Sequence, residues 1–178
     1  PLIGLGQQTY VPDDNFEQEL INLGYDNILD DYVLTANIDT ITYLDVSQQS
    51  ISDLTGIEEF TALIELNCYN QLLTSLNVSN NMDLTVLRCH NNLITSLDVS
   101  NNTDLTYLHC SLNPLTILDV SNNTALTFLY CTHNQLTILD VSNNTDLTEL
   151  YCWDNPLIYL NVDNTKLSGL SAQTIVSD

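Results

Sequence analysis

The sequence predicts a mainly β solenoid, in which short strands stack coil upon coil into two parallel sheets behind an N-terminal helical cap. Three observations predict it. The five cysteines recur at one spacing, two runs of alternating apolar and polar residues recur with them, and a helix-forming segment precedes the repeats. Self-similarity at a period of about 20 to 50 residues indicates stacked units, each of which buries its apolar side against its neighbours.

The repeat is 21 residues long, because Cys68, Cys89, Cys110, Cys131 and Cys152 each lie 21 residues from the next. Aligned on them, the copies read LxxLxCxxNxLxxLDVSxNxx. In LxxLxC the second Leu and the Cys alternate with polar or aromatic residues, as in a strand with one buried face. LDVS alternates in the same way. Each coil is therefore expected to carry two short strands, stacked about 4.8 Å from those of its neighbours.

An asparagine follows each cysteine by three residues, except in the first copy, where Gln71 takes its place. An inward amide can both donate to and accept from backbone groups of adjacent coils. These asparagines are therefore expected to hold an inward turn. They are Asn92, Asn113, Asn134 and Asn155.

The motif LxxLxCxxNxL resembles the leucine-rich-repeat signature LxxLxLxxNxL, with Cys in one Leu position. The 21-residue unit ending in LDVSxN is similar to the short bacterial subclass called IRREKO, common in secreted bacterial proteins, and the similarity covers about residues 63–163. The preceding 22-residue coil, from Ile41 to Ala62, resembles an internalin-type repeat. The resemblance implies a leucine-rich-repeat solenoid whose first strand lines a concave face commonly used for binding.

Five segments follow from this register. They are a leader or expression remnant (1–8), an N-terminal cap (9–40), the 22-residue repeat (41–62), the 21-residue leucine-rich repeats (63–166) and a degenerate C-terminal coil (167–178).

The predicted cap contains a helix. Asp14 can cap its N-terminus with Glu17 in the capping-box position, and Gly24 can end it. Three apolar side chains are expected on its buried face, namely Phe16, Leu20 and Leu23.

Charge excludes several partners. Asp and Glu total 23 against two Lys and Arg, a formal net charge of −21. Nucleic acid binding needs clustered cations, and anionic membranes attract basic segments. Neither nucleic acid nor an anionic membrane surface is therefore expected as a partner. No apolar run approaches the roughly 18 residues that span a bilayer, so no membrane insertion is expected. Abundant Asn, Thr and Ser with little Lys favour a secreted or cell-surface protein.

The cysteines are interpreted as structural. They share one inward position with Val46 upstream and Ala172 downstream, which indicates a small apolar requirement. Zinc needs ligands that converge on a point, whereas these side chains form a line. Parallel in-register side chains also point the same way rather than at each other. We expect five free, buried and unreactive thiols.

The outward positions of the second strand are nearly constant and include Asp98, Asp119 and Asp140. Like charges one strand spacing apart are unfavourable unless donors or a cation offset them. Whether calcium binds this column stays open, although the EF-hand pattern is absent.

The outward positions of the first strand differ in every coil. These 15 positions hold six of the 13 aromatic residues, the single Trp, the single Arg and two of the three His. Clustered exposed aromatic side chains mark recognition surfaces. The sequence therefore predicts a non-catalytic module that binds a protein or glycan. The candidate binding residues are Tyr69, Arg88, His90, Tyr107, His109, Phe128, Tyr130, Glu149, Tyr151 and Trp153, with Glu65 as a further acidic contact.

Other interpretations are weighed against this one. The aromatic side chains could simply stack and protect the sheet of a structural spacer or adhesive stalk. Regular Thr ladders, such as Thr85, Thr106, Thr127 and Thr148, could match ice, although Thr also favours strands. His90 and His109 fall in different columns and do not form a metal set. No phosphate loop, nucleophile elbow or HExxH motif is present, so neither catalysis nor a cofactor is expected.

Overall fold

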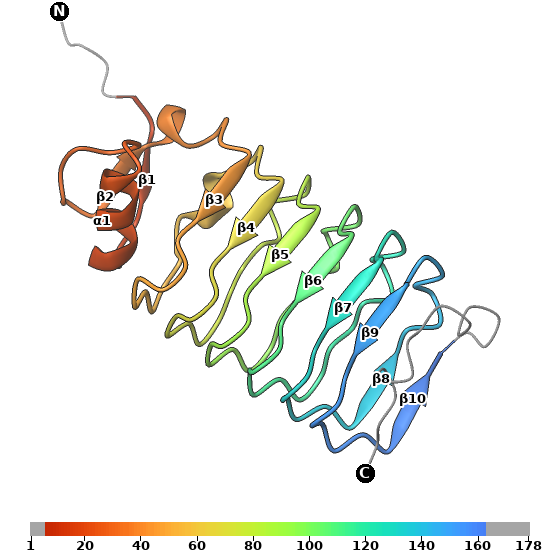
Figure 1. Ribbon diagram of the computed structural model, residues 1–178. Helices are drawn as coiled ribbons and strands as arrows, with labels where there is room; N and C mark the ends of the chain where they lie inside the picture. The colour runs from red at the N-terminus through yellow and green to blue at the C-terminus, as the bar shows by residue number, and fades with distance from the viewer. Residues whose placement is uncertain (1–5, 163–178) are drawn as a thin grey trace, which may run out of the picture.

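The computed structural model describes residues 6–162, which form an elongated stack of coils (Figure 1). One side of the stack is a six-stranded parallel sheet in the order β3-β4-β5-β6-β7-β9. From β4 onward its strands begin 21 residues apart and pair in register. The strands are β3 (Tyr43–Asp45), β4 (Glu65–Asn67), β5 (Val86–Arg88), β6 (Tyr107–His109), β7 (Phe128–Tyr130) and β9 (Glu149–Tyr151).

The interior follows the predicted alternation. In the central coil Leu108 and Cys110 are fully buried, and Leu118 and Val120 point inward with exposed fractions of 5% and 0%. Asp119 between them is exposed. Because every coil repeats this pattern, the apolar side chains merge into one continuous core along the stack.

All five cysteines are buried in this core, as predicted. Cys68, Cys89, Cys110 and Cys131 are free thiols. Burial raises the pKa of the Cys89 thiol to about 12, since an apolar interior disfavours the thiolate. The expected lack of reactivity follows from this, because the thiolate is the nucleophile.

The second parallel sheet is less extensive than predicted. Within residues 6–162 it consists of β8 (Ile138–Asp140) paired with β10 (Tyr159–Asn161), and a single isolated bridge joins Asn77 to Asp98.

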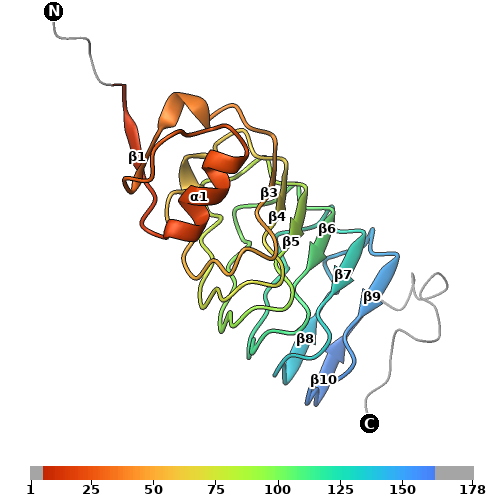
Figure 2. The same cartoon turned by 60° about the vertical axis from the view of Figure 1, so that its left-hand side comes forward.

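The N-terminal segment pairs β1 (Gln8–Tyr10) with β2 (Tyr32–Leu34) in antiparallel fashion and carries the helix α1 (Asp14–Asn22). Two 3-10 turns follow, η1 (Thr35–Asn37) and η2 (Ile57–Glu59). α1 lies at the N-terminal end of the stack (Figure 2). Phe16 is fully buried, and its ring lies 6.3 Å from that of Phe60 in the 22-residue coil. The helix therefore shares the core of the solenoid.

Three details of the predicted helix are wrong, at Asp14, Leu23 and Glu17, and a fourth is confirmed. Asp13, not Asp14, caps the N-terminus, because its carboxylate accepts the N–H groups of Asn15 and Phe16. Leu23 is 41% exposed and lies outside the buried face. Gly24 follows the helix with φ +83°, as expected of a residue that ends one.

Glu17 does not form the predicted capping box. It is fully buried, and its carboxylate accepts the N–H groups of Asp30, Asp31 and Tyr32, which ties the helix to the strand that comes next. These three N–H groups need an acceptor, and this requirement outweighs the capping of the helix N-terminus, since an unpaired buried N–H is costly.

Gln8, which the predicted segmentation assigned to the leader, belongs to β1. Residues 1–5 of that leader and the predicted C-terminal coil 167–178 lie outside the described residues.

Candidate recognition surface

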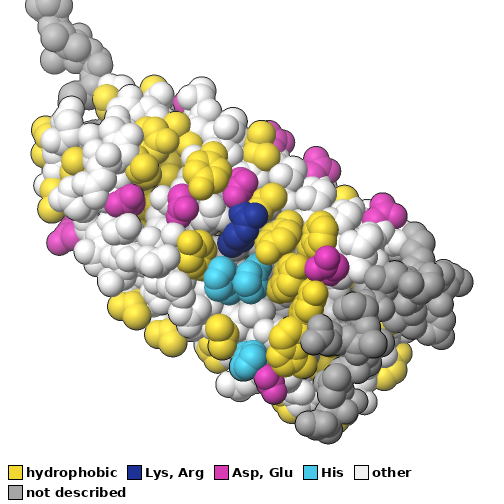
Figure 3. Space-filling view, in the orientation of Figure 1, with side chains coloured by type: hydrophobic (Ala, Val, Ile, Leu, Met, Phe, Trp, Pro, Cys, Tyr) yellow, Lys and Arg dark blue, Asp and Glu magenta, His cyan; other side chains and the backbone are white. Residues whose placement is uncertain are grey.

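The outward side of the six-stranded sheet carries all ten candidate binding residues. We call this side the aromatic face. It consists of the outward side chains of the six strands of this sheet and of the residue two positions after each strand. Figure 3 shows apolar and histidine side chains gathered on it around the arginine. Most candidate side chains are half-buried rather than freely exposed. They therefore support one another and form a connected surface.

Six rings on this face form one row. Successive centroids lie 4.6 Å apart from Tyr69 to His90, 3.8 Å from His90 to His109, 5.2 Å from His109 to Tyr130, 4.7 Å from Tyr130 to Tyr151 and 5.2 Å from Tyr151 to Trp153. We call these six residues the ring row. Four of the five contacts join neighbouring coils. His90 and His109 do fall in different columns, but their rings nevertheless stack.

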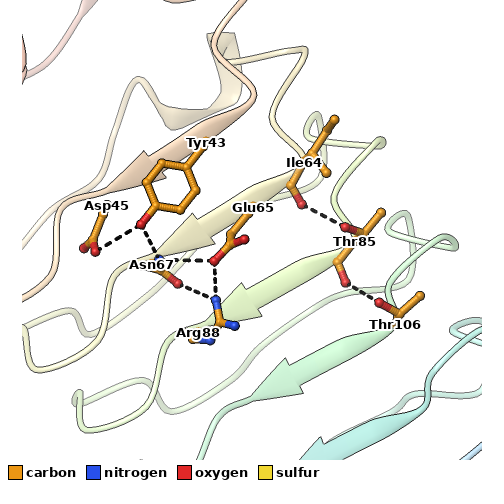
Figure 4. Close-up of polar contacts among 8 residues, drawn as sticks. All are labelled: Tyr43, Asp45, Ile64, Glu65, Asn67, Thr85, Arg88 and Thr106. Carbon is orange, nitrogen blue, oxygen red and sulfur yellow. Dashed lines mark hydrogen bonds and ion pairs between the residues drawn. The ribbon is translucent and has the colours of Figure 1, made fainter.

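Arg88 lies on the aromatic face between the Glu65 carboxylate and the Tyr107 ring, beside the ring row. Its guanidinium forms an ion pair with Glu65, donates to Oδ1 of Asn67 at 3.0 Å and lies 4.8 Å from the centroid of the Tyr107 ring. The Asn67 amide in turn donates to the Tyr43 hydroxyl at 3.2 Å (Figure 4). The single arginine is thus already held between a carboxylate and an aromatic ring.

The Tyr107 ring also lies near two others, 5.8 Å from Phe128 and 5.5 Å from Tyr130. The Tyr130 hydroxyl donates to Oε2 of Glu149 at 2.7 Å. Burial, and then this hydrogen bond, raise the pKa of Tyr130 well above its usual value, so the phenol is neutral and acts as a donor.

The environment of His90 and His109 favours their neutral forms. Burial, then His90 and Arg88, lower the pKa of His109 to about 4. Burial, and then Arg88, also lower the pKa of His90, whose Nδ1 is buried without a hydrogen-bond partner. Stacked neutral rings suit this environment, because a second charge beside the guanidinium would be repelled.

Three positions predicted as outward are not available to a ligand. Asn67, Ser111 and Thr132 are buried, with exposed fractions of 6%, 4% and 7%. Ser111 Oγ accepts the N–H of Thr132 at 3.1 Å, so small polar side chains here tie neighbouring coils together. A position that the alternation places outside is therefore not always exposed.

The inward asparagines do what the repeat predicts. Asn113 donates to the carbonyls of Cys89 and Cys110, both at 3.1 Å, and its Oδ1 accepts the N–H of Ile94 at 3.0 Å. In the first copy Gln71 supplies the same links, with Oε1 accepting the N–H of Ile51 and Nε2 donating to the Val46 carbonyl. We call Asn92, Asn113, Asn134 and Asn155 the asparagine column.

A second column of buried asparagines lies at the turn that follows each LDVS segment or its equivalent. Asn102 donates to the carbonyls of Val78 and Asn81 at 3.0 and 2.8 Å. The Asn that ends each SxN motif is the sequence signal for this column. The members of this column are Asn81, Asn102, Asn123 and Asn144.

A column of left-handed residues was missed. It occupies the turn two residues after each cysteine, or after Val46 in the first coil, and has φ between 54° and 62°; its members are Gln48, Asn70, Asn91, Leu112, His133 and Asp154. The recurring Asn was a usable signal, because Asn tolerates this conformation. Leu112 stands at the same position, and a leucine there does not indicate a left-handed residue.

The aspartate column has its own donors. The carboxylates of Asp98, Asp119 and Asp140 each accept a serine N–H at 2.9 Å. Hydrogen bonds from these serines lower the pKa of all three. Within residues 6–162, no three His, Cys, Asp or Glu side chains group as metal ligands. The serine donors therefore offset part of the repulsion within the column.

The hydroxyls of the threonine ladder beside the aromatic face also form hydrogen bonds with the backbone. The hydroxyls of Thr106, Thr127 and Thr148 donate to the carbonyl one coil earlier, at 3.1, 2.9 and 3.0 Å. The link from Thr106 to Thr85 is seen in Figure 4. Because these donors are used internally, the ladder does not offer the regular free hydroxyl array that would support ice binding.

Comparison with known proteins supports an internalin-like chain. The solved functional domain of InlJ from Listeria monocytogenes, which includes a cysteine ladder, superposes with a TM-score of 0.82 at 42% identity, over 93% of this chain and 37% of that chain. Internalin J of L. monocytogenes serotype 4b is 44% identical over 72 residues, 40% of this chain and 8% of its own length. The chain therefore spans well under half of either relative.

Two further matches agree with a repeat architecture. The LVIVD repeat family matches residues 106–132 and 127–154. An internalin, inlF, from L. monocytogenes shares the fold with a TM-score of 0.66 at 21% identity, over 90% of this chain and 60% of that chain. The chain is therefore similar to internalins of Listeria and has the fold of a parallel-sheet repeat solenoid. In the part that the structure describes, no helix has the length and apolarity to cross a membrane.

Proposed function

We propose that the protein is a non-catalytic recognition module that binds a protein or glycan through the aromatic face. The ring row carries this proposal, because it concentrates half-buried rings on one sheet while the repeat supplies the same scaffold in every coil. Rigid aromatic side chains bury large areas at low entropic cost on binding. The likeness to internalins supports a surface repeat protein that acts through interactions.

Ring geometry favours a polypeptide over a sugar. A sugar binds an aromatic side chain through the open face of its ring. Tyr130 and Tyr151 stack on each other with an interplanar angle of 8°, and Tyr69 and His90 with one of 9°. Their inner faces are therefore occupied, and edges and polar atoms are what the row offers to a ligand. Such a surface suits the backbone and side chains of a protein segment.

A secreted or surface-attached location goes with this function. The surplus of 21 negative charges keeps such a protein soluble and repels polyanions. In this proposal segment 9–40 caps the solenoid, because Phe16 and Leu20 cover core that would otherwise face water.

The structural alternative is a spacer or adhesive stalk. The mutual stacking of the rings favours it, since each ring contact stabilises neighbouring coils without any ligand. Removal of the rings distinguishes the two functions, because only a recognition module loses a ligand with them.

The test is a surface-protein and glycan array probed with the wild type and with Tyr130→Ala/Tyr151→Ala. A recognition module should lose at least tenfold in apparent affinity while its circular dichroism spectrum is unchanged. The matched control is Ile117→Ala/Ile138→Ala, which truncates two exposed apolar side chains on another surface. Equal binding by wild type and both variants, or no ligand at all, would favour the spacer.

A further inference from the structure

The aromatic face contains an arginine that the protein binds for itself. The Arg88 guanidinium pairs with the Glu65 carboxylate and covers the Tyr107 ring at 4.8 Å. A carboxylate beside an aromatic ring is a favourable environment for a guanidinium, since the carboxylate accepts its planar donors and the ring attracts its charge. This arrangement shows which components of the face suffice to hold an arginine.

The same components recur at the other end of the sheet. Glu149 occupies the strand position of Glu65, four coils along the in-register sheet. Phe128 is its register partner on β7, and the Tyr130 hydroxyl donates to its Oε2 at 2.7 Å. Tyr151 follows on the same strand and stacks on Tyr130. The rings come from the preceding coil and from β9 itself, whereas Tyr107 lies two coils after Glu65.

Glu149 has no cation of its own within residues 6–162. The two ion pairs there are Arg88 with Glu65 and His133 with Asp154. Tyr130 binds one carboxylate oxygen of Glu149, which leaves Oε1 as an acceptor for another donor. Glu149 is only half-buried, so a side chain from outside can reach it.

We propose that Glu149, Tyr130, Tyr151 and Phe128 form a subsite for an arginine side chain of a polypeptide ligand. The guanidinium donates to the free Glu149 oxygen and lies over the ring of Phe128, which is not part of the stacked ring row. Arginine fits better than lysine, because its planar donors suit a carboxylate and its weakly hydrated cation stacks on rings. The net charge of −21 draws cationic ligands to the surface. The subsite rests on the proposed function, since it lies on the same face.

The test uses small probes and a reporter that lies close to the subsite. Trp153 is the single tryptophan and lies 5.2 Å from Tyr151, so its indole N–H resonance and its fluorescence report on binding there. N-acetyl-arginine amide should shift these signals with saturation in the millimolar range. The neutral isostere N-acetyl-citrulline amide should bind at least tenfold more weakly, and N-acetyl-lysine amide should lie between them.

Matched variants locate the effect. Glu149→Gln keeps an acceptor for Tyr130 but removes the charge, so arginine binding should fall at least tenfold. Asp83→Asn, which removes an exposed carboxylate outside the aromatic face, should leave the Trp153 response unchanged. Arg88→Ala should create a second arginine site, seen as saturable shifts of the Glu65 and Tyr107 amides that are absent in the wild type.

The outcomes separate the subsite from the function. Equal binding of the arginine and citrulline probes, or unchanged binding by folded Glu149→Gln, would overturn the subsite. If array ligands then still depend on Tyr130 and Tyr151, the recognition function stands without it. If the arginine probe binds through Glu149 but no array ligand depends on the rings, the subsite stands and the proposed function of the whole face fails.

Discussion

The asparagine column and the ring row both run along the stack, but they differ in how far they vary. The asparagine column carries the same residue in four successive coils, and each amide binds backbone groups of its own and a neighbouring coil. The ring row carries Tyr, His, His, Tyr, Tyr and Trp. The asparagine column keeps both its residue and its position, whereas the ring row changes residue from coil to coil and shifts position between His90 and His109.

The difference follows from what each column must satisfy. Buried carbonyls and N–H groups recur identically in every coil, and an unpaired one costs about 1–3 kcal/mol, so one side chain of fixed geometry is needed each time. On the outer surface, water forms the hydrogen bonds that other protein groups do not. The outer column can therefore vary from coil to coil, which is what a surface needs in order to be specific.

The largest expected effect is on the asparagine column. Asn113→Ala removes the partners of the Cys89 and Cys110 carbonyls and of the Ile94 N–H, so the free energy of unfolding should fall by about 2–4 kcal/mol in urea titrations. Asn122→Ala is the control. This exposed residue donates only to the Ser100 carbonyl at 3.2 Å, and its loss should cost less than about 1 kcal/mol.

Removing a ring should cost less. Tyr151→Ala loses the stacking contact with Tyr130 and part of a half-buried ring, so we expect a loss of about 1–2 kcal/mol with the fold retained. Tyr159→Ala, at an exposed position on β10, should cost under about 1 kcal/mol. If Tyr151→Ala were more destabilising than Asn113→Ala, the distinction between structural and variable columns would be wrong.

The ring row should also make stability depend on pH. The folded pKa of His109 is about 4, below its ordinary value near 6.5, so the unfolded chain binds more protons between these values. Its contribution is complete above about pH 6.5 and is lost as the pH falls through this range toward 4. With solvent screening, we expect roughly 1 kcal/mol.

Urea titrations at pH 7 and pH 4.5 measure this dependence. His109→Asn should reduce the difference between the two pH values, whereas the matched substitution His133→Asn, at an exposed turn, should leave the part due to His109 in place. An unchanged pH dependence in His109→Asn would show that the stacked histidine is not its source.

The smallest expected effect lies at the left-handed turn and has the opposite sign. Leu112 has φ 56° and is 47% exposed, whereas Asn70 and Asn91 occupy the same position in earlier coils. Leu112→Asn should stabilise the protein by about 0.5–1 kcal/mol, because Asn adopts this conformation with less strain. Leu93→Asn, also exposed but without positive φ, should not stabilise it. Thermal unfolding of both variants checks this.

Several features of the fold could be predicted from residues that recur in every repeat. The spacing of the cysteines, the alternation around Leu118 and Val120, and the inward amide of Asn113 were all predicted and confirmed. They were predictable because each expresses a local demand that recurs every 21 residues, so repetition removes ambiguity. The candidate binding residues share one face for the same reason, whereas their role in binding stays a prediction.

The remaining features depended on contacts between coils. Sequence spacing placed His90 and His109 in separate columns, but ring size lets them stack across the diagonal. Ser111 and Thr132 stand at positions that the alternation places outside, but both are buried, and a hydrogen bond between them joins neighbouring coils. Glu17 fits a capping box locally but binds three N–H groups of a segment more than ten residues away.

By itself the sequence determined the coil length, the direction of each side chain and the side of the stack on which the aromatic residues gather, because these follow from period and alternation along one chain. Only the tertiary structure decided which outward side chains remain accessible, which rings touch and which carboxylate holds Arg88. Those outcomes depend on side-chain length and packing between neighbouring coils, and the register of a single strand does not contain them.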